Sequence, residues 1–78
     1  MDTIQIDRTL DARGLACPMP IVKTAQAIKT MAPGETLEVL ATDAGSVKDF
    51  AAWSRTTGHA LLESSVDAAT YRFVLRKA

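Results

Sequence analysis

The chain has 78 residues, of which 47% are hydrophobic and 23% charged, so its composition is that of a folded globular domain and not of a disordered segment. Nine basic residues balance nine acidic ones, and a formal net charge of zero argues against a protein built mainly to bind nucleic acid or anionic lipid. A chain of this length has room for one small domain, residues 1–78, and little room for a deep, water-excluded cavity.

The amino terminus and the cysteine content indicate where the chain functions. Residues Met1–Ile4 begin acidic and lack the basic and apolar regions of a signal peptide. No apolar run approaches the ~20 residues that cross a bilayer. We therefore expect a cytoplasmic protein without membrane contact. Its one cysteine, Cys17, cannot form an internal disulfide and would be a free thiol there.

In chain order, alternating polar and apolar residues predict a first strand over Thr3–Asp7. Apolar residues then recur at helical spacing and predict a helix that begins at Pro18 and ends near Pro33. Proline is tolerated in the first turn of a helix because the amide hydrogens there have no intrahelical partner. This start makes Cys17 the expected N-cap residue.

The second half of the chain predicts one more helix and three more strands. Residues Glu35–Thr42 alternate again and predict the second strand. Ser46 is a natural N-cap for the next helix, with Asp49 three residues later in an approximate capping box, and Gly58 suits the helix end. The last two strands are predicted at about His59–Val66 and Thr70–Lys77.

The element order βαβαββ predicts an α/β (α+β) two-layer sandwich. In it, a four-stranded mixed sheet carries both helices on one face. The last strand supports this arrangement, because Tyr71, Phe73 and Leu75 share one face while Arg72 and Arg76 share the other. We therefore expect one covered face of the sheet and one largely wet face.

Cys17 is the candidate for chemistry. A helix N-terminus offers unpaired amide hydrogens and the positive end of the helix dipole, which stabilise a thiolate. Pro18 and Pro20 fix the direction of these groups but supply no amide hydrogens, so we expect a moderately lowered pKa for Cys17. The alternative is that Cys17 packs as a small buried side chain in a non-catalytic interaction or regulatory module.

Two charged residues could form a rim around Cys17. Asp43 follows the second strand and precedes the second helix, and an aspartate there more often caps a turn. Arg13 precedes the cysteine by four residues. Together with Lys23 and Lys29 it could attract an acidic partner, although scattered charges on a small domain usually form a solvated face.

His59 and Trp53 each have a structural and a functional interpretation. His59 could shuttle protons, but it begins a strand and is expected to be structural or solvent-facing. Trp53 lies beside the apolar stripe of the second helix and could be a docking anchor or peripheral core packing. One cysteine and one histidine are too few for a metal site, so no metal is expected.

The sequence resembles the TusA/SirA-like sulfur-carrier family over nearly its whole length. The residues that carry the resemblance are Leu10–Pro20 with its Cys17-Pro18-Met19-Pro20 element, Asp43–Ser46, Asp49, Thr57–His59 and Tyr71–Phe73. The resemblance implies a two-layer α/β sandwich in which Cys17 bears the sulfur. It implies a sulfur donor protein, such as a cysteine desulfurase or rhodanese, and a sulfur acceptor protein, with no metal or organic cofactor and no direct nucleic-acid binding.

Two positions bear on the pathway. Family members that serve tRNA thiolation often carry a basic residue before the cysteine and an acidic residue between the prolines, whereas this chain has Ala16 and Met19. These residues favour a carrier in sulfur oxidation or sulfur trafficking. A carrier for tRNA thiolation or selenium, or a redox sensor using the same thiolate, is the alternative.

Overall fold

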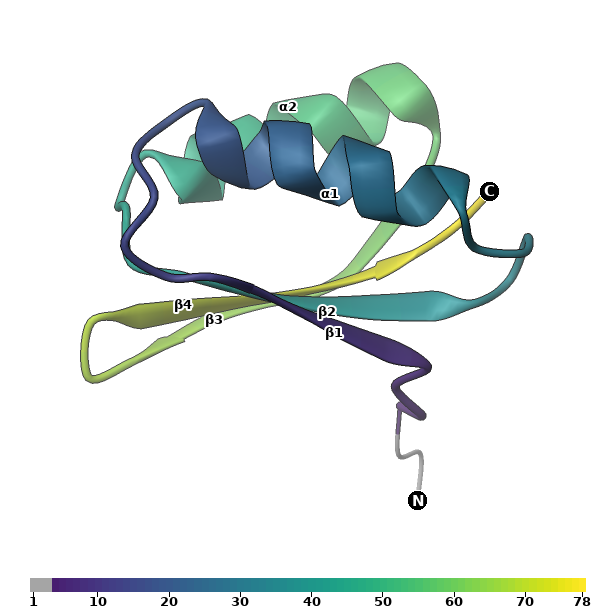
Figure 1. The fold of residues 1–78 in the computed structure, drawn as a ribbon, viewed down its shortest axis with the longest axis horizontal. Coiled ribbons are helices and arrows are strands. Elements are labelled where there is room, and N and C mark those ends of the chain that lie inside the picture. The colour runs from purple at the N-terminus through teal and green to yellow at the C-terminus, as the bar shows by residue number, and fades with distance from the viewer. Residues whose placement is uncertain (1–3) are drawn as a thin grey trace.

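A computed structural model describes residues 4–78 of the chain. Its elements follow the predicted βαβαββ order (Figure 1). Their bounds are β1 (Arg8–Ala12), α1 (Met19–Lys29), β2 (Thr36–Ala41), α2 (Ser46–Thr57), β3 (Ala60–Asp67) and β4 (Thr70–Arg76).

The four strands form one mixed sheet in the order β1-β2-β4-β3. β1 and β2 are parallel, and β4 lies antiparallel between β2 and β3. Both helices lie on one face of the sheet, as Figure 1 shows. The predicted fold class is therefore confirmed: the protein is a two-layer α+β sandwich whose two parallel strands are each followed by a helix.

The prediction of the first strand is wrong. β1 spans Arg8–Ala12, after the predicted Thr3–Asp7, of which residue 3 lies outside the described range. The alternation of polar and apolar residues in β1 is incomplete, because Arg8, at an inward-facing position, is polar. The Arg8 guanidinium reaches the end of α1 and donates to Ala27 O at 3.2 Å and Thr30 Oγ1 at 2.6 Å. Parallel pairing with β2, and not local hydrophobicity, fixes this strand.

α1 is shorter than predicted. It starts at Met19 and ends at Lys29, whereas the prediction ran from Pro18 to about Pro33. Thr30 is the C-cap; its N–H donates to Ala27 O, and the N–H of Met31 donates to Ile28 O, both at 3.1 Å. The chain then turns so that Met31 is buried in the core, and the apolar pattern continues past the helix for this reason.

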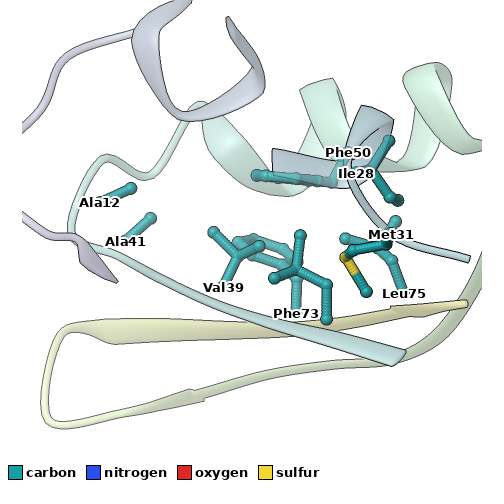
Figure 2. Packing of buried hydrophobic residues seen from close by; sticks show 9 residues of the cluster. Ala12, Ile28, Met31, Val39, Ala41, Phe50, Phe73 and Leu75 are labelled. Carbon is teal, nitrogen blue, oxygen red and sulfur yellow. The ribbon is translucent and has the colours of Figure 1, made fainter. Parts of the chain in front are cut away.

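The core lies between the sheet and the two helices (Figure 2). Phe50 of α2 stacks on Phe73 of β4, with ring centroids 4.3 Å apart and ring planes 22° from parallel. Phe73 and Leu75 are fully buried and Tyr71 packs against the same cluster, as the alternation in β4 predicted. The buried hydrophobic residues of the cluster are Ala12, Ile28, Met31, Leu37, Val39, Ala41, Phe50, Phe73 and Leu75.

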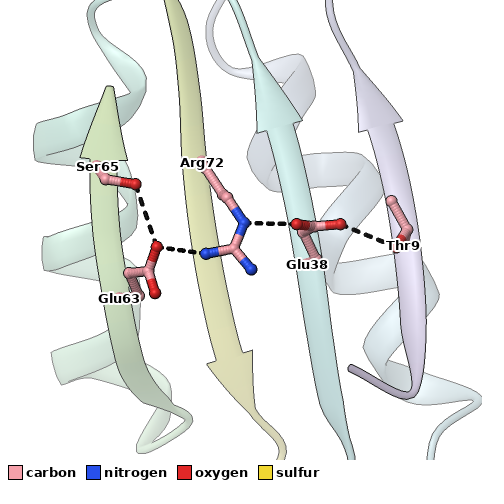
Figure 3. A network of polar contacts seen from close by, with 5 residues as sticks. All are labelled: Thr9, Glu38, Glu63, Ser65 and Arg72. Atoms are coloured by element: carbon pink, nitrogen blue, oxygen red, sulfur yellow. Dashed lines mark hydrogen bonds and ion pairs between the residues drawn. The ribbon is translucent and has the colours of Figure 1, made fainter. Parts of the chain in front are cut away.

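The other face of the sheet carries a polar network (Figure 3). The Arg72 guanidinium lies between Glu38 of β2 and Glu63 of β3 and forms an ion pair with each. Thr9 Oγ1 donates to Glu38 at 3.0 Å. Val74 on the same face, opposite Glu38 and Glu63 in the strand register, is fully buried, so this face is less wet than predicted.

Candidate functional site

The candidate site lies where the two parallel strands end. β1 and β2 pair in register at Ala12 and Ala41, so the loops that leave them begin side by side. The Gly14 N–H donates to Thr42 Oγ1 at 2.9 Å and ties these loops together. Each loop leads into a helix, and the starts of α1 and α2 lie over the same end of the sheet (Figure 1). Side chains from two distant stretches of sequence therefore meet here.

Cys17 lies in the first of these loops, directly before α1. Its side chain is exposed, so it does not pack in the core as the alternative interpretation requires. The N-cap of α1 is Pro18, not Cys17, and the helix starts at Met19. The predicted cap position is therefore wrong by one residue, because Pro18 has non-helical backbone angles and the first helical residue is Met19.

Asp43 holds the backbone of Cys17 from the β2–α2 loop. One carboxylate oxygen, Oδ2, accepts the Cys17 N–H at 2.7 Å. The other, Oδ1, accepts the Gly45 N–H at 3.2 Å. The same carboxylate therefore caps its own turn and lies beside the cysteine, and the sequence had offered these as alternatives.

Asp49 of α2 is the residue at this site that sequence reasoning missed. Its Oδ2 accepts a hydrogen bond from Cys17 Sγ at 2.7 Å. The sequence paired Asp49 with Ser46 in a capping box, but the N-cap is Gly45 and the buried Ser46 hydroxyl has no hydrogen-bond partner among the described residues. The signal was topological: the starts of both helices follow parallel strands, so an acid in the first turn of α2 is placed near Cys17.

The two carboxylates oppose ionisation of the thiol. The hydrogen bond to Asp49 raises the pKa of Cys17, and desolvation and the negative charges of Asp49 and Asp43 raise it further. The expectation of a lowered pKa is therefore wrong in direction. At neutral pH the site holds a hydrogen-bonded thiol.

The start of α1 offers too few donors to reverse this effect. Pro18 and Pro20 have no amide hydrogen. The N–H of Met19 is occupied, since it donates to Ala16 O at 2.9 Å. A helix terminus stabilises an anion mainly through free amide hydrogens in its first turn, and here the prolines remove two of them.

Comparison with known proteins identifies the arrangement. A family model described as "Sulfurtransferase TusA" matches residues 8–77. The chain belongs to the TusA family. Sulfur carrier protein TusA of Allochromatium vinosum is 43% identical over 72 residues, which cover 92% of this chain and 95% of that protein.

Other TusA-family relatives differ in length. YrkI of Bacillus subtilis is 48% identical over 71 residues, or 91% of this chain and 95% of YrkI. YrkF of the same organism is 52% identical over 68 residues, or 87% of this chain but 37% of YrkF, so the chain spans about a third of that relative. The crystal structure of a SirA-like protein from Desulfitobacterium hafniense superposes with a TM-score of 0.77 at 21% identity, covering 88% of this chain and 95% of that one. This likeness supports the fold.

Arg13, the other expected rim residue, is paired elsewhere in this TusA-family member. Its guanidinium donates to both carboxylate oxygens of Asp11, at 2.9 and 3.0 Å. Arg13 thereby lowers the pKa of Asp11 to about 2. Both side chains are more than half exposed, so the pair adds little to stability.

His59 and Trp53 pack at the opposite end of α2 from the TusA-family cysteine. Trp53 is half-buried, meets Phe50 edge-on at 6.4 Å and lies 5.3 Å from the His59 ring. His59 Nδ1 accepts the Ala78 N–H at 3.0 Å. These contacts favour the structural interpretation of both residues.

Exposed apolar side chains lie on the first turns of both helices. Met19 and Val22 of α1 and Val47 of α2 are 39%, 37% and 41% exposed. Lys23 and Lys29 are exposed on α1. The helix turns that follow Cys17 and Asp43 in sequence therefore expose both apolar and basic side chains.

Within residues 4–78, no three His, Cys, Asp or Glu side chains are grouped as they would be around a metal ion. In the same part of the chain, no helix is both long and apolar enough to cross a membrane.

Proposed function

We propose that this protein is a cytoplasmic sulfur carrier that holds sulfur as a persulfide on Cys17. Membership in a family whose members include a named sulfur carrier supports the general role. The observation that carries the assignment to Cys17 is the exposure of the only thiol in the chain at the junction of two helix starts. A buried thiol could not meet a donor protein.

Loading is a thiol–persulfide exchange. Ionised Cys17 Sγ attacks the outer sulfur of a donor persulfide, a new S–S bond forms, and the donor's inner sulfur leaves as a thiolate. The proton lost by Cys17 balances that thiolate, so the net change is donor persulfide plus thiol to donor thiol plus Cys17 persulfide. Discharge repeats this step with an acceptor thiol, and neither direction needs an oxidant, a metal or an organic cofactor.

Pro18, Pro20 and Asp43 support the sulfur in this scheme by fixing the backbone around it. Pro20 is buried at the start of α1, and Pro18 restricts the residue before it. Asp43 holds the Cys17 N–H from the neighbouring loop. Sγ is therefore presented from a backbone with little freedom, which lowers the entropy that docking with a partner must remove.

The proposed partners are a sulfur donor, such as a cysteine desulfurase or rhodanese, and an acceptor protein with its own reactive thiol. The exposed apolar residues Met19, Val22 and Val47 suit a protein contact around Cys17. Ala16 and Met19 favour a pathway of sulfur oxidation or trafficking over tRNA thiolation.

Intact-mass measurement after incubation with a persulfide donor tests the proposal. We expect the gain of one sulfur atom, reversed by a thiol reductant, because the chain has one landing site. The matched control is Cys17→Ser, which keeps the shape and removes the thiol. If the parent gains no sulfur, or if the control gains as much, Cys17 is not the carrier residue.

A further inference from the structure

We propose that Asp49 limits the rate of sulfur exchange at Cys17 by holding the unloaded residue as a hydrogen-bonded thiol. The inference rests on the proposed carrier function and adds a residue to it. Asp49 would slow reactions of Cys17 with small thiols, electrophiles and oxidants, and so keep the thiol available for a docked partner.

The geometry supports this role because Asp49 contacts the reacting atom itself. Cys17 Sγ lies 2.7 Å from Asp49 Oδ2, and Asp43 holds the backbone N–H of the same cysteine. With both the amide and the sulfur fixed, the side chain is held against a carboxylate. A carboxylate accepts the thiol proton in a hydrogen bond and repels a thiolate.

The two charged groups that contact Cys17 both oppose its ionisation, and the nearest cation of α2 in sequence, Lys48, is exposed and forms no ion pair with either of them. α2 contributes Asp49 and the β2–α2 loop contributes Asp43, and both disfavour the anion. The loop before the cysteine contributes Arg13, whose charge is paired with Asp11. α1 has no acidic residue in its first turn, and its first cation, Lys23, follows four uncharged residues.

The size of the effect follows from how thiols react. Lowering a thiol's pKa by one unit raises the thiolate fraction tenfold and lowers the intrinsic nucleophilicity by a smaller factor, so the observed rate below the pKa rises by roughly 3–4-fold per unit. Removing the Asp49 charge should therefore make Cys17 faster, even though a carboxylate beside a thiol could be read as a general base.

Discharge is slowed for the same reason. When an acceptor attacks the outer sulfur of the persulfide, Cys17 Sγ is the leaving group, and a thiolate of higher pKa leaves more slowly. The negative charge that then develops on Sγ lies beside the carboxylate of Asp49, which disfavours it. A loaded carrier is thereby protected from loss of sulfur to free thiols.

The first test measures the alkylation of unloaded protein by iodoacetamide across pH. Asp49→Asn is expected to react several-fold faster at neutral pH, with a lower midpoint in its pH profile. The matched control is Glu35→Gln, which makes the same charge change beyond the opposite end of β2 and can still accept the Ala32 N–H. The control should match the parent. An unchanged midpoint in Asp49→Asn, or a slower reaction that would identify Asp49 as a proton acceptor, overturns the inference.

A second measurement needs no variant and therefore holds even if Asp49→Asn folds poorly. Cys17 is treated with a cationic trimethylammonioethyl and an anionic sulfonatoethyl methanethiosulfonate, and the ratio of the two rates is compared between native and urea-unfolded protein. We expect the native protein to favour the cationic reagent several-fold more than the unfolded chain does. Equal ratios would overturn the inference. Because both tests use unloaded protein, they can fail while sulfur loading on Cys17 succeeds, and the reverse.

Discussion

Two groups of acidic side chains in this protein have opposite effects on the group between them. On the sheet face away from the helices, Glu38 and Glu63 flank the guanidinium of Arg72 and favour its charged form, since their hydrogen bonds raise the pKa of Arg72. At the helix starts, Asp43 and Asp49 flank the thiol of Cys17 and raise its pKa. Carboxylates therefore stabilise the positive charge of Arg72 in one place and destabilise the negative charge of a Cys17 thiolate in the other.

This difference separates the Arg72 network, which stabilises the sheet, from the candidate site around Cys17. The Arg72 network joins β2, β3 and β4 and is complete within the fold. At the Cys17 site, by contrast, neither Asp43 nor Asp49 forms an ion pair with a cation within residues 4–78. The predictions below use substitutions that affect one region and leave the other unchanged.

The largest expected effect is on activity. Cys17→Ser should lower sulfur acceptance to background, because a hydroxyl cannot hold sulfane sulfur or leave as thiolate. Since Cys17 is exposed, the melting temperature should stay close to that of the parent. Intact mass and thermal denaturation measure both quantities. A large loss of stability would mean that Cys17 packs in the fold and would count against the proposed site.

The reverse pattern is expected for Arg72→Gln. Removing the guanidinium leaves Glu38 and Glu63 facing each other, so we expect a loss of about 1–2 kcal/mol in the free energy of unfolding. That corresponds to a fall of roughly 5–10 °C in melting temperature for a domain of this size. Sulfur loading measured below the transition should be unchanged. A loading defect would show that the two regions are coupled.

The two regions should also respond to pH with opposite sign. The pKa of Glu38 is lowered in the folded state, so its contribution is present above the ordinary carboxyl range of about 4 and is lost as the pH falls through the folded value. The pKa of Cys17 is raised, so its contribution is present below the ordinary thiol value of about 8.5 and is lost as the pH rises through the folded value.

Urea midpoints measured across pH separate these contributions. Glu38→Gln should flatten the acid limb relative to the parent, and Cys17→Ser should flatten the alkaline limb. If Cys17→Ser shows the same alkaline slope as the parent, the thiol does not contribute to the pH dependence of stability.

The smallest expected effect is on a buried residue of the helix layer, outside both regions. Thr24 of α1 is fully buried and its hydroxyl has no hydrogen-bond partner among the described residues. Thr24→Val replaces the hydroxyl with a methyl group of similar shape and should stabilise the fold by about 0.5–1 kcal/mol. Thermal denaturation checks the sign, with Thr24→Ala as the control that removes packing as well. A destabilised Val variant would mean that a water molecule satisfies the hydroxyl.

The sequence predicted the fold class because its signals are local. The periodicities of α2, β2 and β4 and the glycine that ends α2 each act within one element, and Gly58 indeed has a left-handed backbone with φ 83°. β1 failed because its inward Arg8 is accommodated by a partner on α1, which no local pattern encodes. α1 was extended too far because Met31 is buried without being helical.

For the site, the sequence indicated the cysteine and missed its environment. Cys17 could be singled out by its position before a proline-rich helix start, and Asp43 by its place after a strand. The direction of the pKa shift could not be predicted, because it depends on Asp49, which is 32 positions away and reaches the sulfur only through the packing of two helices. The long-range contact reversed the effect expected from the helix terminus alone.

That separation along the chain also has a kinetic meaning. Asp43 and Asp49 reach Cys17 across 26 and 32 residues, so neither can act on the thiol before β1 and β2 have paired and both helices have docked. A newly made or unfolded chain therefore carries a cysteine of ordinary acidity, open to oxidation and alkylation. Once the chain has folded, Asp49 and Asp43 raise the pKa of Cys17 and so lower the reactivity of its thiol at neutral pH. The reactivity of this single thiol is thus a built-in reporter of native structure, and rapid folding protects the residue on which the proposed function depends.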